Sequence, residues 1–200
     1  MSNYRVGICI LTGGRSTRMG QDKMQLSYNG KKMYEEAAER LNKVAPYRFL
    51  SVNGQSINEY PEWICVKDQV EGLGPIGGIS SVLEYINALS EDDAYKCDAV
   101  LFCAGDMPYF DAKEATSIIE GYSGEDVMVV HAKGDVQPLA SVFAVSFLPT
   151  IKEEIQNGNY KLRRIIEKAE KKGKYDSENS ECYANINTPL EAESVKGIKL

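Results

Sequence analysis

Short apolar runs alternate along this chain with segments in which apolar residues recur at helical spacing. The runs that we interpret as strands are Val6–Leu11, Arg48–Val52, Ile64–Lys67, Ala99–Ala104, Val127–His131 and Leu139–Val145, with Tyr183–Thr188 and a short terminal helix closing the chain. The helical patterns cover Lys32–Val44, Ile76–Leu89, Asp111–Tyr122, Phe147–Gln156 and Lys161–Lys172. This alternation predicts an α/β fold with a mostly parallel central sheet and helices on both faces.

Length and charge narrow the classes of protein further. A chain of 200 residues with no dividing linker suits one domain, so we treat residues 1–200 as a single domain. The formal net charge of -6 argues against a nucleic-acid binder, which needs a broad basic face. No apolar run approaches the roughly 20 residues that cross a bilayer, and Val6–Leu11 is too short for a signal peptide.

The number and spacing of the cysteines indicate in which compartment the protein works. There are 5 of them, and no pair has C-x-x-C spacing, so neither a disulfide framework nor a zinc site is indicated. Cys9 and Cys103 lie in apolar runs, where a free thiol behaves as a small hydrophobic side chain. A reducing cytoplasm fits this usage best.

A polar loop follows the first strand and runs from Thr12 to Lys23. Its adjacent glycines, Gly13 and Gly14, let backbone N–H groups turn toward an anion without a Cβ in the way. Arg18 and Lys23 add positive charge. The loop lacks the Gly-Lys-Ser/Thr of a Walker A motif, but its composition suits a triphosphate.

Two more segments follow strands whose carboxyl ends should meet at one edge of the sheet, where open α/β sheets bind ligands. Asp106 comes just after Ala99–Ala104, and a carboxylate there can hold Mg²⁺ against phosphate oxygens. The segment Asp68–Gly78 contains G-x-G-x-x-G spacing, but its first glycine does not follow the strand directly, and Pro75 removes an N–H. We therefore interpret this segment as a ligand-lining loop that opens a helix.

The loop from Leu11 to Lys23 resembles the L-A-G-G-x-S-x-R-M-G-x-D-K signature of the molybdenum cofactor guanylyltransferases, the MobA family. The other blocks that agree in order are Gly74–Ile79, Asp106–Pro108, Gln137–Leu139 and Asn185–Pro189. Two residues depart from the pattern, because Thr12 replaces the usual Ala and Gly105 replaces the usual Cys. Neither change removes a charged group, so we expect activity to survive.

The resemblance implies a single-domain, Rossmann-like three-layer sandwich that transfers GMP from GTP to molybdenum-loaded molybdopterin and releases pyrophosphate. It also implies that Mg²⁺ is the cofactor, held by Asp106. The residues expected to contact the nucleotide are Leu11, Thr12, Gly13, Gly14, Lys23, Asn53, Asp68 and Asp106, with Arg18, Lys23 and Asp106 as the catalytic set. Because the acceptor phosphate is already an anionic nucleophile, the enzyme mainly has to align it and neutralise the leaving pyrophosphate.

The acceptor phosphate needs its own basic residues, and we assign it to Lys161 and Arg164. These two are three residues apart on the expected helix and therefore share a face. In extended chain, the alternation of Asn185 and Asn187 about an isoleucine puts both amides on one side. Asparagine amides can read the polar edge of a pterin-like ring, and paired cations suit its phosphate.

Other functions stay open at this point. A related enzyme, a cytidylyltransferase or a sugar-phosphate nucleotidyltransferase, would share most of these residues. Gly13 favours GTP, because the cytidylyltransferases carry Ala there and a missing Cβ leaves room for a purine. A module that binds nucleotide without turnover is the remaining alternative, and the presence of both Lys23 and Asp106 argues against it. The sequence leaves the oligomeric state open, a monomer included.

Overall fold

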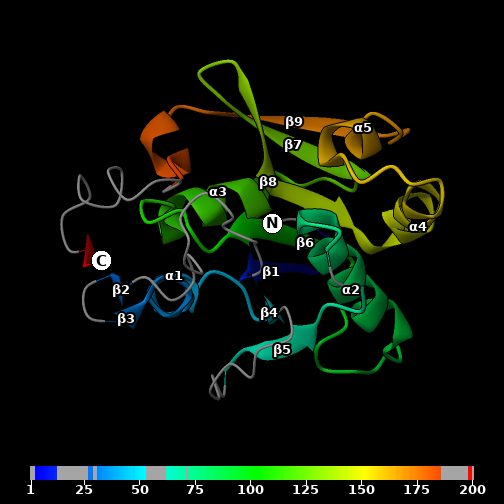
Figure 1. The fold of residues 1–200 in the computed structure, drawn as a ribbon, viewed down its shortest axis with the longest axis horizontal. Helices are drawn as coiled ribbons and strands as arrows, with labels where there is room; N and C mark the ends of the chain where they lie inside the picture. The colour runs from blue at the N-terminus through cyan, green and yellow to red at the C-terminus, as the bar shows by residue number, and fades with distance from the viewer. Residues whose placement is uncertain are drawn as a thin grey trace.

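The computed structural model describes residues 3–12, 27–28, 31–52, 62–70, 72–185 and 198–199. Within them, a 7-stranded sheet has the order β5-β4-β1-β6-β8-β7-β9 (Figure 1). Its strands are β1 (Val6–Leu11), β4 (Arg48–Val52), β5 (Ile64–Lys67), β6 (Ala99–Ala104), β7 (Val127–Ala132), β8 (Asp135–Ala144) and β9 (Lys172–Ser177). β8 runs antiparallel to both of its neighbours, and the other adjacent pairs are parallel.

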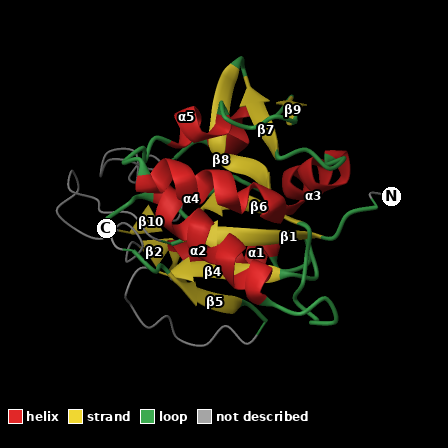
Figure 2. Ribbon diagram, turned by 90° about the vertical axis from the view of Figure 1, so that its right-hand side faces the viewer, coloured by secondary structure: helices red, strands yellow, loops and turns green. Residues whose placement is uncertain are grey.

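Helices cover both faces of this sheet. They are α1 (Met33–Leu41), α2 (Pro75–Ala88), α3 (Ala112–Gly121), α4 (Leu148–Gln156) and α5 (Leu162–Ile166). In Figure 1, α1 and α3 lie to the left of the sheet and α2, α4 and α5 to the right. Figure 2 shows α2 and α4 together on the face of the sheet turned toward the viewer. The three layers confirm the predicted α/β sandwich with a mostly parallel sheet.

The core consists of two clusters, one on each face of the sheet. Along β1, Ile8 and Ile10 belong to the cluster under α1 and α3, whereas Cys9 and Leu11 belong to the cluster under α2, α4 and α5. Since all six residues of β1 are buried, a continuous apolar run is what this position requires. None of the helices in the described part of the chain has the length and apolar character needed to cross a bilayer.

The predicted helix Lys161–Lys172 is wrong over its second half. α5 ends at Ile166, and residues from Lys172 onward form β9, which pairs with β7. The side chain of Asp126 explains the change, because its Oδ2 accepts the backbone N–H groups of Glu170 at 3.0 Å and Lys171 at 2.9 Å. These bonds turn the chain out of its helical course and into the edge of the sheet.

The short helix expected after Thr188 falls mostly on residues 189–197, which lie outside the described residues. Ile198–Lys199 form a short strand, β10, in a 3-stranded sheet of order β10-β2-β3. The partners are β2 (Ser27–Tyr28) and β3 (Lys31–Lys32). The 3₁₀ helices η2 (Val145–Phe147) and η3 (Ser180–Tyr183) complete the described elements. The expected strand Tyr183–Thr188 begins inside η3, and residues 186–188 lie outside the described residues.

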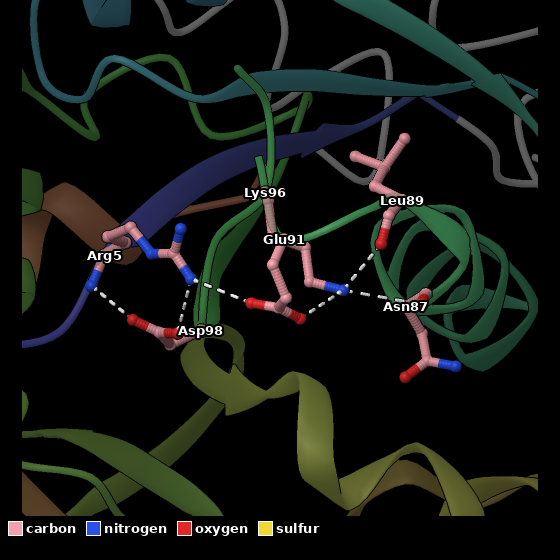
Figure 3. A network of polar contacts seen from close by, with 6 residues as sticks. All are labelled: Arg5, Asn87, Leu89, Glu91, Lys96 and Asp98. Atoms are coloured by element: carbon pink, nitrogen blue, oxygen red, sulfur yellow. Dashed lines mark hydrogen bonds and ion pairs between the residues drawn. The ribbon is translucent and has the colours of Figure 1, made fainter. Parts of the chain in front are cut away.

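A polar network ties together the amino ends of β1 and β6 (Figure 3). Arg5 donates its backbone N–H to Asp98 Oδ2 at 2.7 Å, and its guanidinium lies 3.3 Å from Asp98 Oδ1. Lys96 donates to the carbonyl oxygen of Leu89 at 2.9 Å, just after the last residue of α2, and pairs with Glu91. These paired charges hold the amino ends of β1 and β6 and the end of α2 together. The predicted nucleotide-binding residues within the described ranges lie at the opposite ends of the strands.

Candidate functional site

The strand order places a topological switch point beside β1. From β1 the chain moves to β4 and β5 on one side, and then returns to β6 on the other. Leu11 at the end of β1 is in register with Ser51 of β4 and with Ala104 of β6. Ligands of open α/β sheets bind in the crevice beyond the strand ends at such a point. Leu11, Thr12, Asp68 and Asp106, all predicted site residues, stand at this edge.

Thr12 closes the end of β1 against β4. Its backbone N–H and its hydroxyl both donate to the carbonyl oxygen of Ser51, at 3.1 Å and 2.7 Å. The Thr12 side chain is 8% exposed. The hydroxyl that distinguishes this chain from the usual Ala is therefore satisfied within the sheet.

Asp68 is held at the end of β5 by a neighbouring strand. Ser51 donates its hydroxyl to Asp68 Oδ1 at 2.7 Å, and Asp68 donates its backbone N–H to the carbonyl oxygen of Val52 at 2.9 Å. Partial burial raises the pKa of the Asp68 carboxyl, and the bond from Ser51 opposes part of that rise. A fixed, half-buried carboxylate of this kind can accept hydrogen bonds from the hydroxyl groups of a ligand.

Ser51 and Gly78 are the two residues of this site that sequence reasoning missed as individuals. Ser51 is 1% exposed and connects Thr12 with Asp68. A Cβ on Gly78 would lie 2.3 Å from Ser51 Oγ, so α2 passes directly over the strand end. The available signals were a lone serine within an apolar strand and the glycine pair of the block Gly74–Ile79.

The helix α2 begins at this same edge, as predicted for a ligand-lining loop that opens a helix. Gly74 is its N-cap residue with φ of 68°, a conformation that favours glycine, and Pro75 follows at the first helical position. A helix start of this kind carries a partial positive charge. An anionic ligand at the strand ends would therefore face a favourable dipole.

Asp106 stands beyond the carboxyl end of β6. The preceding residue, Gly105, donates its backbone N–H to the carbonyl oxygen of Leu11 at 3.0 Å, which extends the bonding of β1 and β6 past the strands. Asp106 itself is partly exposed, whereas Met107 and Phe110 after it are 3% and 1% exposed. The carboxylate therefore stands on a loop whose apolar side chains are anchored in the core.

Burial makes the cysteines near this edge poor nucleophiles. Cys9 and Cys103 are 0% and 1% exposed, and burial raises the pKa of Cys103 to about 12. A thiol with such a pKa has almost no thiolate at neutral pH. The expectation that these two cysteines act as small hydrophobic side chains is confirmed, and the polar groups of the edge are left to carry any chemistry.

The predicted acceptor residues lie apart from the strand ends of β1 and β6. Lys161 is the N-cap residue of α5, and both Lys161 and Arg164 are exposed. α5 lies beside the β7–β8 hairpin, because Arg163 donates to the carbonyl oxygen of Val136 at 3.3 Å. Val136 is in register with His131, so this contact is near the carboxyl end of β7. Asn185, which follows η3, is also exposed.

The remaining predicted site residues lie outside the described residues. They are Gly13, Gly14, Arg18, Lys23, Asn53 and Asn187. Their assignments stay predictions. The structure thus brings Thr12, Asp68 and Asp106 to one edge.

Fold and site together define an α/β protein whose ligand would bind beyond the carboxyl ends of its strands, with carboxylates and a helix start around it. The family model described as the MobA-like NTP transferase domain matches residues 8–173. The chain belongs to this family, which confirms the resemblance inferred from its sequence.

Individual relatives agree with this result over most of the chain. A "Probable molybdenum cofactor guanylyltransferase" of Thermococcus gammatolerans is 31% identical and covers 78% of this chain and 79% of its own. A protein with the same name from Thermococcus sibiricus is 28% identical, with coverage of 91% and 86%. The crystal structure of molybdopterin-guanine dinucleotide biosynthesis protein A from Archaeoglobus fulgidus superimposes with a TM-score of 0.73 at 21% identity, covering 94% of this chain and 95% of that one. This last likeness shows the shared fold.

Proposed function

We propose that this chain transfers GMP from GTP to molybdenum-loaded molybdopterin, with release of pyrophosphate. The observation that carries the proposal is the placement of Asp68 and Asp106 at the switch point of a chain that belongs to the MobA-like family. The names of the curated relatives supply the substrates. The free, mostly buried cysteines fit a reaction in the reducing cytoplasm.

The donor set at the strand ends fits Mg²⁺. Within the described residues no group of three or more His, Cys, Asp or Glu side chains could hold a metal. Mg²⁺ does not require such a cage, because it usually binds one or two carboxylates together with substrate phosphates and water. Asp106 would be the protein ligand. When bound, the ion would neutralise charge on the phosphates during transfer.

The chain's own residues would orient the two substrates. The loop Leu11–Gly14 would present backbone N–H groups to GTP, with Lys23 and Arg18 against its phosphates. Asp68 would accept hydrogen bonds from the ribose, since Ser51 already fixes its other oxygen. Asn53 would lie near the base. The acceptor phosphate would then attack the α-phosphorus in line with the leaving pyrophosphate.

The acceptor would extend from the strand ends toward α5 on one face of the sheet and toward the end of η3 on the other. Lys161 and Arg164 are exposed there and would hold its phosphate. Asn185 and Asn187 would bond to the polar edge of the pterin.

The test is a pyrophosphate-release assay with GTP, CTP and ATP, each with molybdenum-loaded molybdopterin and with a sugar phosphate as acceptor. We expect release from GTP with the molybdopterin acceptor and a need for Mg²⁺. Release from CTP in preference to GTP would instead support a cytidylyltransferase. Tight GTP binding without release from any acceptor would support a binding module.

Two carboxylates at opposite ends of β6 provide a matched pair of variants. Asp106→Asn should abolish release, because an amide is a far weaker ligand for Mg²⁺ than a carboxylate. Asp98→Asn changes the carboxylate that precedes the same strand and bonds to Arg5, so it should leave turnover close to wild type. Normal turnover by Asp106→Asn at ordinary Mg²⁺ concentrations would refute the metal assignment.

A further inference from the structure

One arginine of α1 reaches across to the loop that carries Asp106. Arg40 donates Nε–H to the carbonyl oxygen of Phe110 at 2.8 Å and Nη2–H to that of Met107 at 3.2 Å. Phe110 in turn donates its backbone N–H to the Met107 carbonyl at 3.3 Å, which closes a turn directly after Asp106. The guanidinium therefore binds both ends of this turn.

The burial of the turn increases the stabilisation that the two Arg40 bonds give to it. Met107 and Phe110 are buried among the core residues below α1 and α3, and the ring of Phe110 lies 5.8 Å from that of Tyr183. A buried carbonyl without a partner is costly, and bonds to a charged donor are stronger than neutral ones. Arg40 itself is half-buried, so water competes less for its donors than at an exposed site.

We propose that Arg40 is a positioning residue, which holds the 106–110 turn in the conformation that presents the Asp106 carboxylate to a divalent cation. This inference rests on the proposed function, because it takes Asp106 as the metal ligand. A carboxylate that must first be ordered binds a cation more weakly by the cost of ordering it. Loss of Arg40 should therefore weaken metal binding without changing any atom that touches the metal.

The geometry of the two bonds requires a guanidinium. Nε and Nη2 belong to one rigid plane and reach two carbonyls in fixed directions, whereas a lysine ammonium is a single point donor on a flexible stem. Arg40→Lys keeps the charge and should lose at least one bond. Arg40→Met keeps a chain of similar length and loses both bonds.

Arg48 is a matched control on the neighbouring strand. It also donates to backbone carbonyls, those of Glu62 at 3.0 Å and Asn42 at 2.7 Å. It is the first residue of β4, at the amino edge of the sheet and away from Asp106. Arg48→Lys therefore removes the same kind of bond without reaching the candidate site.

The experiment measures Mn²⁺ binding to the GTP complex from the free-ion signal in electron paramagnetic resonance, together with hydrogen exchange of residues 105–111. We expect Arg40→Met to weaken Mn²⁺ binding about tenfold or more, because the loss of even one bond to a charged donor corresponds to roughly that factor. Arg40→Lys should weaken it by a smaller factor, and both should speed exchange at the Phe110 amide. Arg48→Lys should leave both readouts at wild-type values, and metal-free GTP binding should be unchanged in all three variants.

The proposal is overturned if a folded Arg40→Met protein binds Mn²⁺ as the wild type does, or if Arg48→Lys shows the same loss. If Arg40→Met fails to fold, Mn²⁺ binding by Arg40→Lys is compared with the wild type instead, and unchanged binding overturns the proposal. A wild type that binds Mn²⁺ and GTP but releases no pyrophosphate with any acceptor contradicts the proposed function alone. In that case a selective loss of Mn²⁺ binding in the Arg40 variants still supports the positioning role.

Discussion

The closest packing at the candidate site is the crossing of α2 over the end of β4, and Gly78→Ala would disturb it. A Cβ on Gly78 would lie 2.3 Å from Ser51 Oγ and 3.0 Å from Leu11 Cδ2. Ser51 and Leu11 are 1% and 5% exposed, so neither side chain can move into solvent to make room. The added methyl group has to push α2 away from the sheet.

Gly77 is the neighbouring helix position, and it has more room for an added methyl group. Its nearest atoms would be Leu73 Cβ and the Val70 carbonyl oxygen, both at 3.3 Å. Val70 is 54% exposed and belongs to the loop ahead of α2, which can give by a few tenths of an ångström. Gly77→Ala therefore keeps most of the benefit that Ala has over Gly in a helix.

Two opposing contributions set the expected magnitudes. Replacing Gly by Ala within a helix stabilises by roughly 0.8–1.0 kcal/mol. Overpacking a closed core site costs typically about 1–3 kcal/mol. Gly78→Ala should thus lower the free energy of unfolding by roughly 1 kcal/mol net, whereas Gly77→Ala should leave it unchanged or raise it slightly. For a chain of 200 residues, 1 kcal/mol corresponds to about 2–4 °C in Tm.

Urea denaturation of both variants measures this difference, and a double variant checks its cause. Ser51→Ala removes the oxygen nearest to the new methyl group, so Ser51→Ala combined with Gly78→Ala should be more stable than the sum of the single effects predicts. A Gly78→Ala protein as stable as Gly77→Ala would refute the reasoning. Strict additivity in the double variant would show that Ser51 is not the obstacle.

Three further outcomes follow from single groups. Burial raises the pKa of Asp68, so the ionised carboxylate opposes folding at neutral pH. Asp68→Asn should therefore be at least as stable as the wild type at pH 7 and should lose this advantage as the pH falls toward 3.8. The Tm of both proteins at several pH values measures the difference. Tyr183→Phe removes the bond of 2.5 Å from the tyrosine hydroxyl to buried Glu114, which should cost about 1.5–3 kcal/mol in urea denaturation. The Lys161→Ala/Arg164→Ala pair should weaken acceptor binding about tenfold or more and leave GTP binding unchanged in titrations of both ligands, and equal effects on both ligands would contradict the acceptor assignment.

The central strands could be predicted because burial on both faces leaves a plain sequence signal. Val6–Leu11 and Ala99–Ala104 are apolar throughout, and the structure places β1 and β6 at those bounds. The helix predicted from Asp111 also begins there, and Asp111 accepts the backbone N–H of Glu114 at 2.8 Å, as an N-cap residue does. In these elements the local sequence and the tertiary environment require the same residues.

The edge strand β9 could not be predicted, because most of its side chains contact solvent and few contact the core. Its burial alternates between exposed and partly buried positions, and Lys172 and Lys174 occupy exposed ones. Lysines at a sheet edge discourage pairing with other chains, yet in sequence they resemble a solvated helix end. The signal that starts β9 is the carboxylate of Asp126, more than 40 residues earlier in the chain.

The carboxylates of the candidate site could be predicted from the sequence, whereas the residues that hold them in place could not. Asp68 and Asp106 follow strands, and the rule for open sheets is enough to bring them to one edge. Ser51 and Arg40 act through contacts with residues far along the chain, at separations of 17 for Asp68 and 67 for Met107. A lone serine in an apolar strand draws attention to Ser51, but nothing in the local sequence identifies the distant residue that Ser51 or Arg40 contacts.

We expect the two departures from the family signature to be mild for a related reason. Thr12 keeps the backbone bond to Ser51 that any residue could make there, and its additional hydroxyl bonds to the same carbonyl oxygen. Gly105 keeps the backbone bond to Leu11 and needs no side chain to do so. Main-chain bonds between strand ends therefore hold both positions, while side chains and turns aim the carboxylates of Asp68 and Asp106. Substitutions at the first kind of position should be mild in this fold, whereas substitutions of Ser51 or Arg40 should impair the site although neither residue stands in the signature.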